Sequence, residues 1–423
     1  AIFLGSLLGA MALGIPIAFS LLLCGAALMW HMSMFDPQIL AQNVINGADS
    51  FPLLAVPFFM LAGEVMNAGG LSRRIVNFAL ALVGHIKGGL GYVAIVAAVM
   101  MAALSGSAVA DAAALTALLL PMMVAAGHDK GRSAGLLASA SIIAPIIPPS
   151  IGFVIFGVAA NLSISKLFLA GIAPGIMLGA ALWFTWWWLV RKEKITAPPR
   201  ASKAEVLAAF KDATFALVLP VIVVVGLKFG VFTPTEAAVV AAVYALLISL
   251  FVYKELKLGQ LYGLFLAAAK TTSVIMFLVA AAMVSAWMIT VANLPADLVA
   301  LLEPLLDNQT LLMFAIMGVV ILVGTAMDMT PTILILTPVL MPIVKAAGID
   351  PVYFGVLFII NNAIGLITPP VGTVLSTVAG VGKISMDQVT KGVWPFMIAQ
   401  FALLFLMVIF PELVMVPARW FYG

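Results

Sequence analysis

The sequence repeats a set of backbone-determining residues at one fixed offset of 221 positions. Seven pairs share this offset: Pro121 and Pro342, Gly127 and Gly348, Asp129 and Asp350, Pro148 and Pro369, Pro149 and Pro370, Gly171 and Gly392, and Pro174 and Pro395. A period this long excludes a solenoid, whose units are about 20 to 50 residues long. We interpret the chain as two copies of one multi-helix unit, 1–190 and 213–423, joined by a linker at 191–212.

The composition places both copies in a lipid bilayer. Of the 423 residues, 64% are hydrophobic and only 9% are charged, whereas about 25% of a soluble domain is charged. This excludes a cytosolic enzyme and a disordered chain. The apolar residues would supply roughly a dozen spans of about 20 residues each. We therefore predict an all-α polytopic membrane protein. Its net charge of +3 is too small to indicate a nucleic-acid partner.

The basic residues predict an orientation for each copy. Six Lys or Arg residues lie within 191–211, directly after tryptophans at 183 and 186–188 that resemble an interfacial belt. The positive-inside rule places this linker in the cytoplasm. The turn at 128–132 is also basic, but its counterpart at 349–352 has no Lys or Arg. The two copies therefore lie inverted in the membrane, and we expect a periplasmic N-terminus.

Each copy contains two short apolar arms on either side of a polar tip. In the first, arms at 88–104 and 112–126 flank the tip 105–111; in the second, arms at 311–323 and 333–347 flank the tip 324–332. Arms of about 15 residues are too short to cross a bilayer comfortably. We predict re-entrant hairpins at 88–126 and 311–347, because non-helical backbone at that depth is tolerated only inside protein or beside an aqueous cavity.

A helix interrupted by two prolines follows each hairpin, at 133–163 and 352–382. Proline has no N–H to donate to the carbonyl four residues earlier. Pro148-Pro149 and Pro369-Pro370 should therefore leave bare carbonyls at Ala144, Pro145, Gly365 and Leu366. Such oxygens suit a small cation, and the N-terminus of the following half-helix suits an anion.

Four segments give the chain its resemblance to a known family. They are PFFMLAGE at 57–64, SGSAVAD at 105–111, IIPPS at 146–150 and LITPPVG at 366–372. Together they resemble the large membrane subunit (M, DctM-like) of tripartite ATP-independent periplasmic (TRAP) transporters, and the resemblance extends over essentially the whole chain. It implies an elevator-type carrier of the ion transporter superfamily, in the bacterial inner membrane. Such a subunit is no enzyme.

The resemblance also implies the transported species and the partners. Sodium ions would drive uptake of a small organic anion: sialic acid, another acidic sugar or a C4-dicarboxylate. The expected partners are a small four-helix membrane subunit (Q-type) and a soluble periplasmic substrate-binding protein (P-type). No cofactor besides the coupling sodium ions is expected.

Site residues follow from the resemblance position by position. The first sodium site would comprise Ser105, Ser107, Ala144 and Ser150. The second would comprise Gly324, Thr325, Asp328, Gly365, Thr368 and Val371. The substrate would lie between the tips, near Ser107, Ser141, Asn361, Asn362 and Thr373. Many of these ligands would be backbone carbonyls, which explains glycine and valine among them.

Some alternatives stay open at the level of the sequence. Asp111 and Asp328 could bind ions or protons, or could cap the second helix of each hairpin. Glu64, Glu236 and Lys270 are interpreted as residues that pair between the copies or extend to the membrane surface. A stand-alone sodium-driven dicarboxylate or citrate carrier is the alternative function. An intramembrane aspartyl enzyme is a remote one, disfavoured because the chain has no G-x-G-D pattern.

Overall fold

The computed structural model describes residues 2–191, 195 and 199–422, which form helices and no strands. The middle of the predicted linker, at 192–194 and 196–198, lies outside the described residues. Eight helical segments of the described chain are long and apolar enough to cross a membrane: Phe51–Ala68, Ala108–Ala125, Ile164–Val190, Lys203–Lys228, Pro234–Val252, Leu258–Val291, Met329–Ala346 and Met386–Ile409. The predicted class, an all-α polytopic membrane protein, is confirmed.

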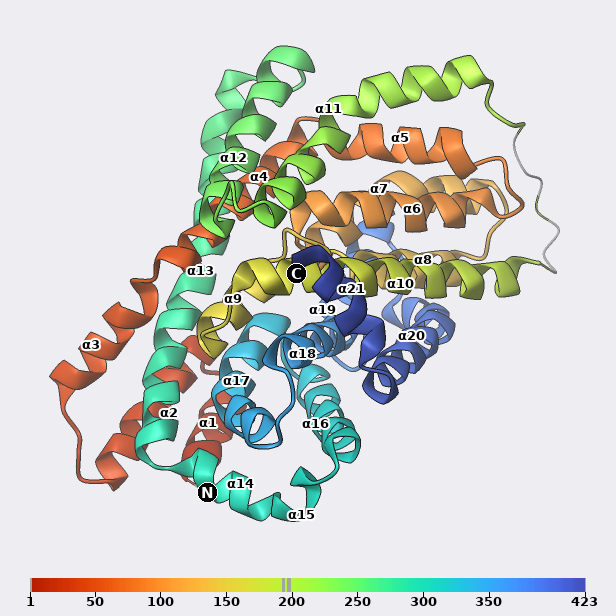
Figure 1. The fold of residues 1–423 in the computed structure, drawn as a ribbon. Coiled ribbons are helices and arrows are strands. Elements are labelled where there is room, and N and C mark those ends of the chain that lie inside the picture. Colours follow the sequence, from red (N-terminus) through yellow and green to blue (C-terminus); the bar gives the residue numbers. More distant parts are fainter. Residues whose placement is uncertain (1, 192–194, 196–198, 423) are drawn as a thin grey trace.

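One group of helices forms a layer at the left of Figure 1. From the first half come α1 (Ile2–Ala12), α2 (Ile17–His31), α3 (Pro37–Ala48), the short η1 (Phe51–Leu54) and α4 (Ala55–Ala68). The second half adds α12 (Pro234–Leu247), its π-helical extension η2 (Ile248–Val252) and α13 (Leu258–Val291). Helix α13 packs against α2, α3 and α4, while α12 packs against α4. We call α2, α3, α4, α12 and α13 the scaffold.

The remaining helices follow the same order in both halves. The first half has α6 (Gly89–Ser105), α7 (Ala108–Ala125), α8 (Lys130–Ser141), α9 (Ile151–Ala160) and α10 (Ile164–Val190). The second has α16 (Gln309–Gly324), α17 (Met329–Ala346), α18 (Pro351–Gly365), α19 (Thr373–Gly382) and α20 (Met386–Ile409). The starts of α7 and α17 and those of α8 and α18 differ by the predicted 221 positions. The short α14 (Leu294–Leu301) and α15 (Glu303–Leu306) precede α16, and α21 (Glu412–Tyr422) follows α20.

The second arm of each hairpin is longer than predicted. Helices α7 and α17 begin at Ala108 and Met329, so each has 18 residues. Ser107 provides the reason in the first copy, because its hydroxyl accepts a hydrogen bond from the Ala110 N–H at 3.4 Å. Such a cap lets the small residues after it form the first helical turn. Residues assigned to the polar tip are thus helical, and the tip itself is short.

The two halves interlock through their hairpins and broken helices. Helix α7 packs against α19, α17 against α9, and α8 against α20. Glycines allow the last of these contacts, because an added Cβ at Gly135 would collide with the backbone of Gly392. Buried Gln400 of α20 donates from Nε2 to the Ser139 carbonyl of α8 at 2.9 Å. Helices α6 to α9 and α16 to α20 therefore form one packed unit, which we call the hairpin unit.

The predicted tryptophan belt is only partly correct. Trp187 and Trp188 are exposed, as residues at a membrane surface should be. Trp186 is instead fully buried and donates from Nε1 to the Gly88 carbonyl at 2.9 Å. Its indole packs against Gly91, because glycine has no side chain that would collide with the ring. Trp186 thus joins α10 to the start of the first hairpin.

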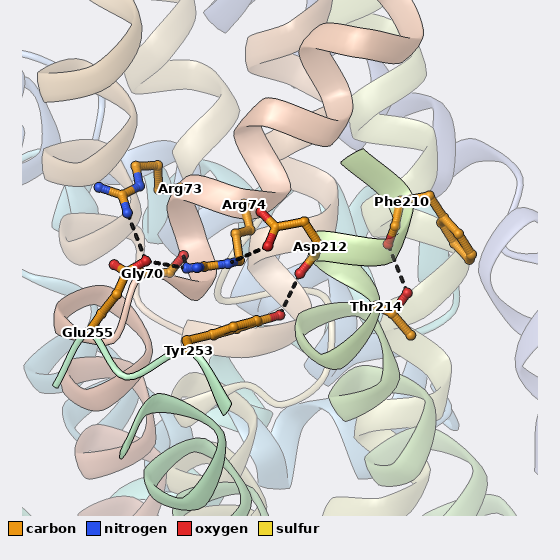
Figure 2. Close-up of polar contacts among 8 residues, drawn as sticks. All are labelled: Gly70, Arg73, Arg74, Phe210, Asp212, Thr214, Tyr253 and Glu255. Carbon is orange, nitrogen blue, oxygen red and sulfur yellow. Dashed lines mark hydrogen bonds and ion pairs between the residues drawn. The ribbon is translucent and has the colours of Figure 1, made fainter. Parts of the chain in front are cut away.

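A polar cluster joins α5 (Leu71–Val83) to α11 (Lys203–Lys228) and to the loop before α13. Figure 2 shows Arg74 between two carboxylates, 3.0 Å from Asp212 and 2.6 Å from Glu255. Its guanidinium lies 3.7 Å from the ring centre of Tyr253, whose hydroxyl donates to the Asp212 carbonyl. Arg73 adds a second ion pair to Glu255 at 2.8 Å. The cluster fixes α5, which leads into the first hairpin, to the second half of the chain.

Candidate functional site

The tip of the first hairpin rests on the first proline pair. Ser105 ends α6, Gly106 has a φ of +60°, and Ser107 begins the next helix. The Ser107 N–H donates to the Ser105 hydroxyl at 3.2 Å, which closes the turn. An added Cβ at Gly106 would collide with the carbonyl oxygen of Pro149. The structure therefore brings together the tip and the break of the first predicted sodium site.

The first break keeps one of its two predicted bare carbonyls. Ser150 caps α9 by accepting from the Phe153 N–H at 3.1 Å, and its own hydroxyl donates to the Pro145 carbonyl. The prediction of a bare carbonyl at Pro145 is therefore wrong, because the serine after the prolines turns back to it. The Ala144 carbonyl accepts no hydrogen bond from the residues that the structure describes. Both lone pairs of this oxygen are therefore available to a cation.

In the second break both predicted bare carbonyls are hydrogen-bonded. The Gly365 carbonyl accepts from the Thr368 N–H at 3.0 Å, and the Leu366 carbonyl accepts from the Val374 N–H at 3.1 Å. Thr368, directly before the prolines, closes a tight turn onto Gly365, and Val374, beyond the prolines, reaches back to Leu366, which corrects the prediction. A carbonyl oxygen has two lone pairs, so one hydrogen bond still leaves it able to bind a cation.

The tip of the second hairpin meets the second break through two glycines. An added Cβ at Gly365 would lie 3.1 Å from the Gly324 carbonyl oxygen, so the two backbones are in close contact. The Thr373 hydroxyl donates to Asp328 Oδ1 at 3.4 Å. Residues of the second predicted sodium site and of the predicted substrate site are thereby neighbours.

Other predicted ligands of this second site are oriented differently. The hydroxyls of Thr325 and Thr368 donate to carbonyls of their own chain segment, those of Leu322 and Ile364, at 2.7 and 2.8 Å. Val371 is exposed. Its backbone carbonyl accepts from the Ser376 hydroxyl at 3.4 Å.

A cavity of about 650 Å³, which we call the tip cavity, lies between the two tips and the scaffold. The hairpin unit lines it with residues of both tips and both breaks: Gly106, Ser107, Ala108, Val109, Ala110, Ala113, Ile151, Asp328, Met329, Thr330 and Leu366. The scaffold lines it with Met60 and Glu64 of α4 and with Lys270, Thr271, Val274 and Ile275 of α13. The first residues of α7 and α17 therefore face this space, and the positive ends of helix dipoles favour an anion there.

The predicted substrate residues divide into two groups. Ser107 lines the tip cavity, and Thr373 contacts Asp328, which also lines it. Ser141, Asn361 and Asn362 are buried and lie outside the lining. The two asparagines donate from Nδ2 to backbone carbonyls at 2.8 Å, but neither Oδ1 has a hydrogen-bond partner in the described structure. A role of these three residues in substrate binding stays a prediction.

The two aspartates do not cap helices through their side chains. Ser107 holds the capping position of α7, and Asp328 stands at that position of α17 without a capping hydrogen bond. Asp111 lies in the first turn of α7, fully buried, and its carboxylate interacts with the Ser105 side chain and not with a backbone N–H of that turn. Capping is therefore the wrong interpretation for both.

Sequence reasoning underestimated Glu64 and Lys270. Pairing between the copies was one expected role, yet neither residue forms an ion pair within the part of the chain that the structure describes. Both side chains line the tip cavity instead. An ionisable residue inside an apolar helix is itself a signal of function, and it was available in the sequence.

Comparisons with known proteins agree with this arrangement. The sequence profile described as "Tripartite ATP-independent periplasmic transporter, DctM component" matches residues 4–413. The chain is 57% identical over 419 residues to the 2,3-diketo-L-gulonate TRAP transporter large permease protein YiaN of Escherichia coli, with 99% of each chain covered. It is 38% identical to the sialic acid TRAP transporter large permease protein SiaM of Vibrio cholerae, with 98% and 97% covered.

Two further similarities concern a more distant relative and the fold. The C4-dicarboxylate TRAP transporter large permease protein DctM of Pseudomonas aeruginosa is 36% identical, with 95% of this chain and 94% of that protein covered. The crystal structure of the Alcanivorax borkumensis YdaH transporter is similar with a TM-score of 0.67 at 15% identity, covering 91% of this chain and 90% of that one. At that identity the likeness shows the fold alone.

Proposed function

Because this chain belongs to the DctM family of TRAP transporter large permeases, we propose that it imports a small organic anion coupled to sodium. As a member it is a multi-pass membrane protein and a transporter subunit rather than an enzyme. The family assignment sets aside the stand-alone carrier and the aspartyl enzyme.

The tip cavity is the observation that carries the proposal. It lies where two helix N-termini, two hairpin tips and two scaffold helices meet, and its volume of about 650 Å³ falls in the range of about 300 to 1,000 Å³ usual for small-molecule sites. One wall belongs to the hairpin unit and the other to the scaffold. We propose an elevator mechanism, in which the hairpin unit moves as a rigid body along the scaffold and carries the cavity across the membrane.

Sodium would bind at the two contacts between a tip and a break. The first site would use Ser105, Ser107, Ala144 and Ser150, and its support is the contact between Gly106 and Pro149. The second would use Gly324, Thr325, Asp328, Gly365, Thr368 and Val371, supported by the contact between Gly324 and Gly365. Oxygen ligands of this kind suit a hard cation. A bound ion would join each tip to its break and so shape the cavity wall.

A sugar acid is the substrate class that we favour. The 57% identity to a 2,3-diketo-L-gulonate permease exceeds the 38% to a sialic acid permease and the 36% to a C4-dicarboxylate permease. A sugar acid also suits a cavity that is lined by one lysine and two carboxylates, because its carboxylate and its hydroxyls need opposite partners. We propose 2,3-diketo-L-gulonate as the first candidate, with sialic acid and C4-dicarboxylates after it.

We further propose the two partners and the orientation implied by the family resemblance. A small four-helix permease subunit would cover part of the scaffold, and a periplasmic binding protein would deliver the anion. The N-terminus would face the periplasm of the bacterial inner membrane, and the basic linker would face the cytoplasm. The basic loop at the start of α8, opposed to a loop without Lys or Arg at the start of α18, supports this orientation.

Uptake into proteoliposomes tests the proposal. The large subunit is reconstituted with its small subunit, and radiolabelled 2,3-diketo-L-gulonate, sialic acid or succinate is added outside with the cognate binding protein. An inward sodium gradient should drive accumulation of one of these anions, while an equal potassium gradient should not. Accumulation without sodium would refute the coupling, and accumulation without the binding protein would refute that partner. As the reverse test, an outward sodium gradient should drive the labelled anion out of vesicles that already contain it.

A further inference from the structure

We propose that Lys270 binds the carboxylate of the transported anion from the scaffold side of the tip cavity. This inference rests on the proposed function, because it names the cationic contact at the same site. Of the described residues that line the cavity, Lys270 is the single cation. It belongs to neither tip nor break, so it forms no part of the predicted sodium or substrate sites.

The depth of Lys270 argues against a purely structural role. It lies 12 residues after Leu258, where α13 begins, which is about 18 Å along the helix at 1.5 Å per residue. Lys270 therefore lies inside Leu258–Val291, a segment long and apolar enough to cross a membrane, and not at either of its ends. Basic side chains inside a membrane span are disfavoured, and they normally form ion pairs or line a water-filled cavity. Lys270 is exposed on the wall of the cavity and has no ion pair to any described residue, so its ammonium group is available to a ligand that enters there.

The opposite wall complements an anion held by Lys270. The N-terminal residues of α7 and α17 face the same cavity, so their dipoles add positive potential. Glu64 and Asp328 also line it and present carboxylates. Those two groups repel a second negative charge but accept hydrogen bonds from hydroxyls. The arrangement favours a substrate with one carboxylate and several hydroxyls.

Because Lys270 belongs to the scaffold, its contact with the anion would exist on one side of the membrane only. Helix α13 packs against α2, α3 and α4, whereas Ser107 and Asp328 belong to the hairpin unit. In an elevator movement the two walls slide past each other, so an anion travelling with the tips leaves Lys270 behind. Lys270 therefore strengthens binding on one side of the membrane and releases the anion as the hairpin unit moves.

Variants at two positions of α13 test this role. K270M removes the charge and keeps the length of the side chain, while K270R retains a cation. K257M is the matched control, because Lys257 precedes the same helix and is exposed as Lys270 is, but lies outside the cavity lining. Val274 lies one turn after Lys270 and lines the same cavity. V274K can therefore restore a cation in K270M, and V274E in the native background places a competing carboxylate beside Lys270.

The readout is the apparent KM of sodium-driven uptake, measured with whichever of 2,3-diketo-L-gulonate, sialic acid or succinate the wild type accumulates. Loss of a charge-assisted contact should raise the KM of K270M by about tenfold or more. K270R and K270M/V274K should recover most of the affinity, V274E should also raise the KM, and K257M should match the wild type. The sodium dependence should be unchanged throughout.

Two results would overturn the inference. One is an unchanged KM in both K270M and V274E; the other is a raised KM in K270M that neither K270R nor V274K corrects, which would indicate a structural role. If K270M does not reach the membrane, V274E and K270R still decide the question. Failure of the wild type to accumulate any of the three anions with sodium would instead refute the proposed function, so the two failures are distinct.

Discussion

Placing a methyl group on Gly106 tests whether the tip of the first hairpin must rest on the proline break. Gly106 has a φ of +60°, and an L-residue in this left-handed region costs about 1–2 kcal/mol. The new Cβ would also collide with the Pro149 carbonyl oxygen and lie 3.5 Å from the Ile151 nitrogen. Both neighbours are backbone atoms, so no flexible side chain can move aside. Such overpacking costs typically about 1–3 kcal/mol more.

Gly127 provides the matched control, because it shares the conformation without the contact. It lies in the turn between α7 and α8 with a φ of +90°, and nothing lies within 4 Å of the position where its Cβ would be. G127A should therefore show only the conformational cost of about 1–2 kcal/mol. The difference between the two variants, about 1–3 kcal/mol, isolates the contact of the tip with Pro149. It corresponds to a decrease of about fivefold to 150-fold in the equilibrium constant for closing the tip.

Two measurements on purified protein and proteoliposomes decide the outcome. Thermal unfolding in detergent should show G106A to be less stable than G127A, and both less stable than the wild type. Sodium-driven uptake should fall about fivefold or more in G106A and stay near the wild-type rate in G127A. If G106A transports as well as G127A does, the closed contact with Pro149 is not required and the assignment of the first sodium site is refuted.

Three further outcomes are expected. D328N should raise the sodium concentration for half-maximal uptake about tenfold, because it removes an anionic ligand; an unchanged sodium curve excludes Asp328 from the site. E255Q should lower the free energy of unfolding by about 1–3 kcal/mol, because Arg74 is only 14% exposed and loses its 2.6 Å ion pair. Chemical unfolding measures this free energy, and an unchanged value would contradict the prediction. Burial, together with the nearby charge of Arg132, lowers the pKa of His128 in the folded protein, so the unfolded chain binds the proton more tightly. Thermal stability should therefore be full above about pH 6.5 and should fall as the pH is lowered below that value. The fall should be smaller in H128Q.

Local chemistry explains which parts of the fold could be predicted from the sequence. Ser107 and Ser150 fix the starts of their helices through hydrogen bonds to the third residue after them. These bonds depend on a few adjacent residues, and prolines and glycines likewise determine the backbone around them. A pattern of such residues repeated at a fixed offset therefore predicts repeated helices, and the starts at Ala108 and Met329 show the same offset.

The fate of the freed carbonyls could not be predicted in the same way. Each proline removes one known donor, but the donor that replaces it depends on the path of the chain after the break. The Leu366 carbonyl is bonded by the N–H of Val374, eight residues later, and the Pro145 carbonyl by the Ser150 hydroxyl. The sequence shows which carbonyls lose a partner, whereas only the folded turn shows which of them finds another.

The lining of the cavity depends on packing between distant helices and was missed for that reason. Helix α13 is not clearly amphipathic, so its sequence does not indicate which neighbouring helix Lys270 faces. Packing of α13 against α4, and of both against the two tips, turns Lys270 and Glu64 toward one space. Asp111 illustrates the same limit, since its position in the first turn suggested a cap, but its buried carboxylate accepts no backbone N–H of that turn.

The charges around the tip cavity give a reason why an anion and sodium should travel together. The lining contains two carboxylates, Glu64 and Asp328, and one ammonium, Lys270, so its formal charge in the ionised forms is −1. An anion entering alone would change the formal charge of the site from −1 to −2 in a medium of low dielectric constant, where such a charge is strongly disfavoured. One sodium ion at each proposed site and one monoanionic substrate bring the sum to zero. Each species then lowers the free energy of binding of the other by the same amount, as linkage requires. The scaffold charges of Glu64 and Lys270 cancel each other, so in the proposed elevator movement Asp328, two sodium ions and a monoanion would cross together without net charge.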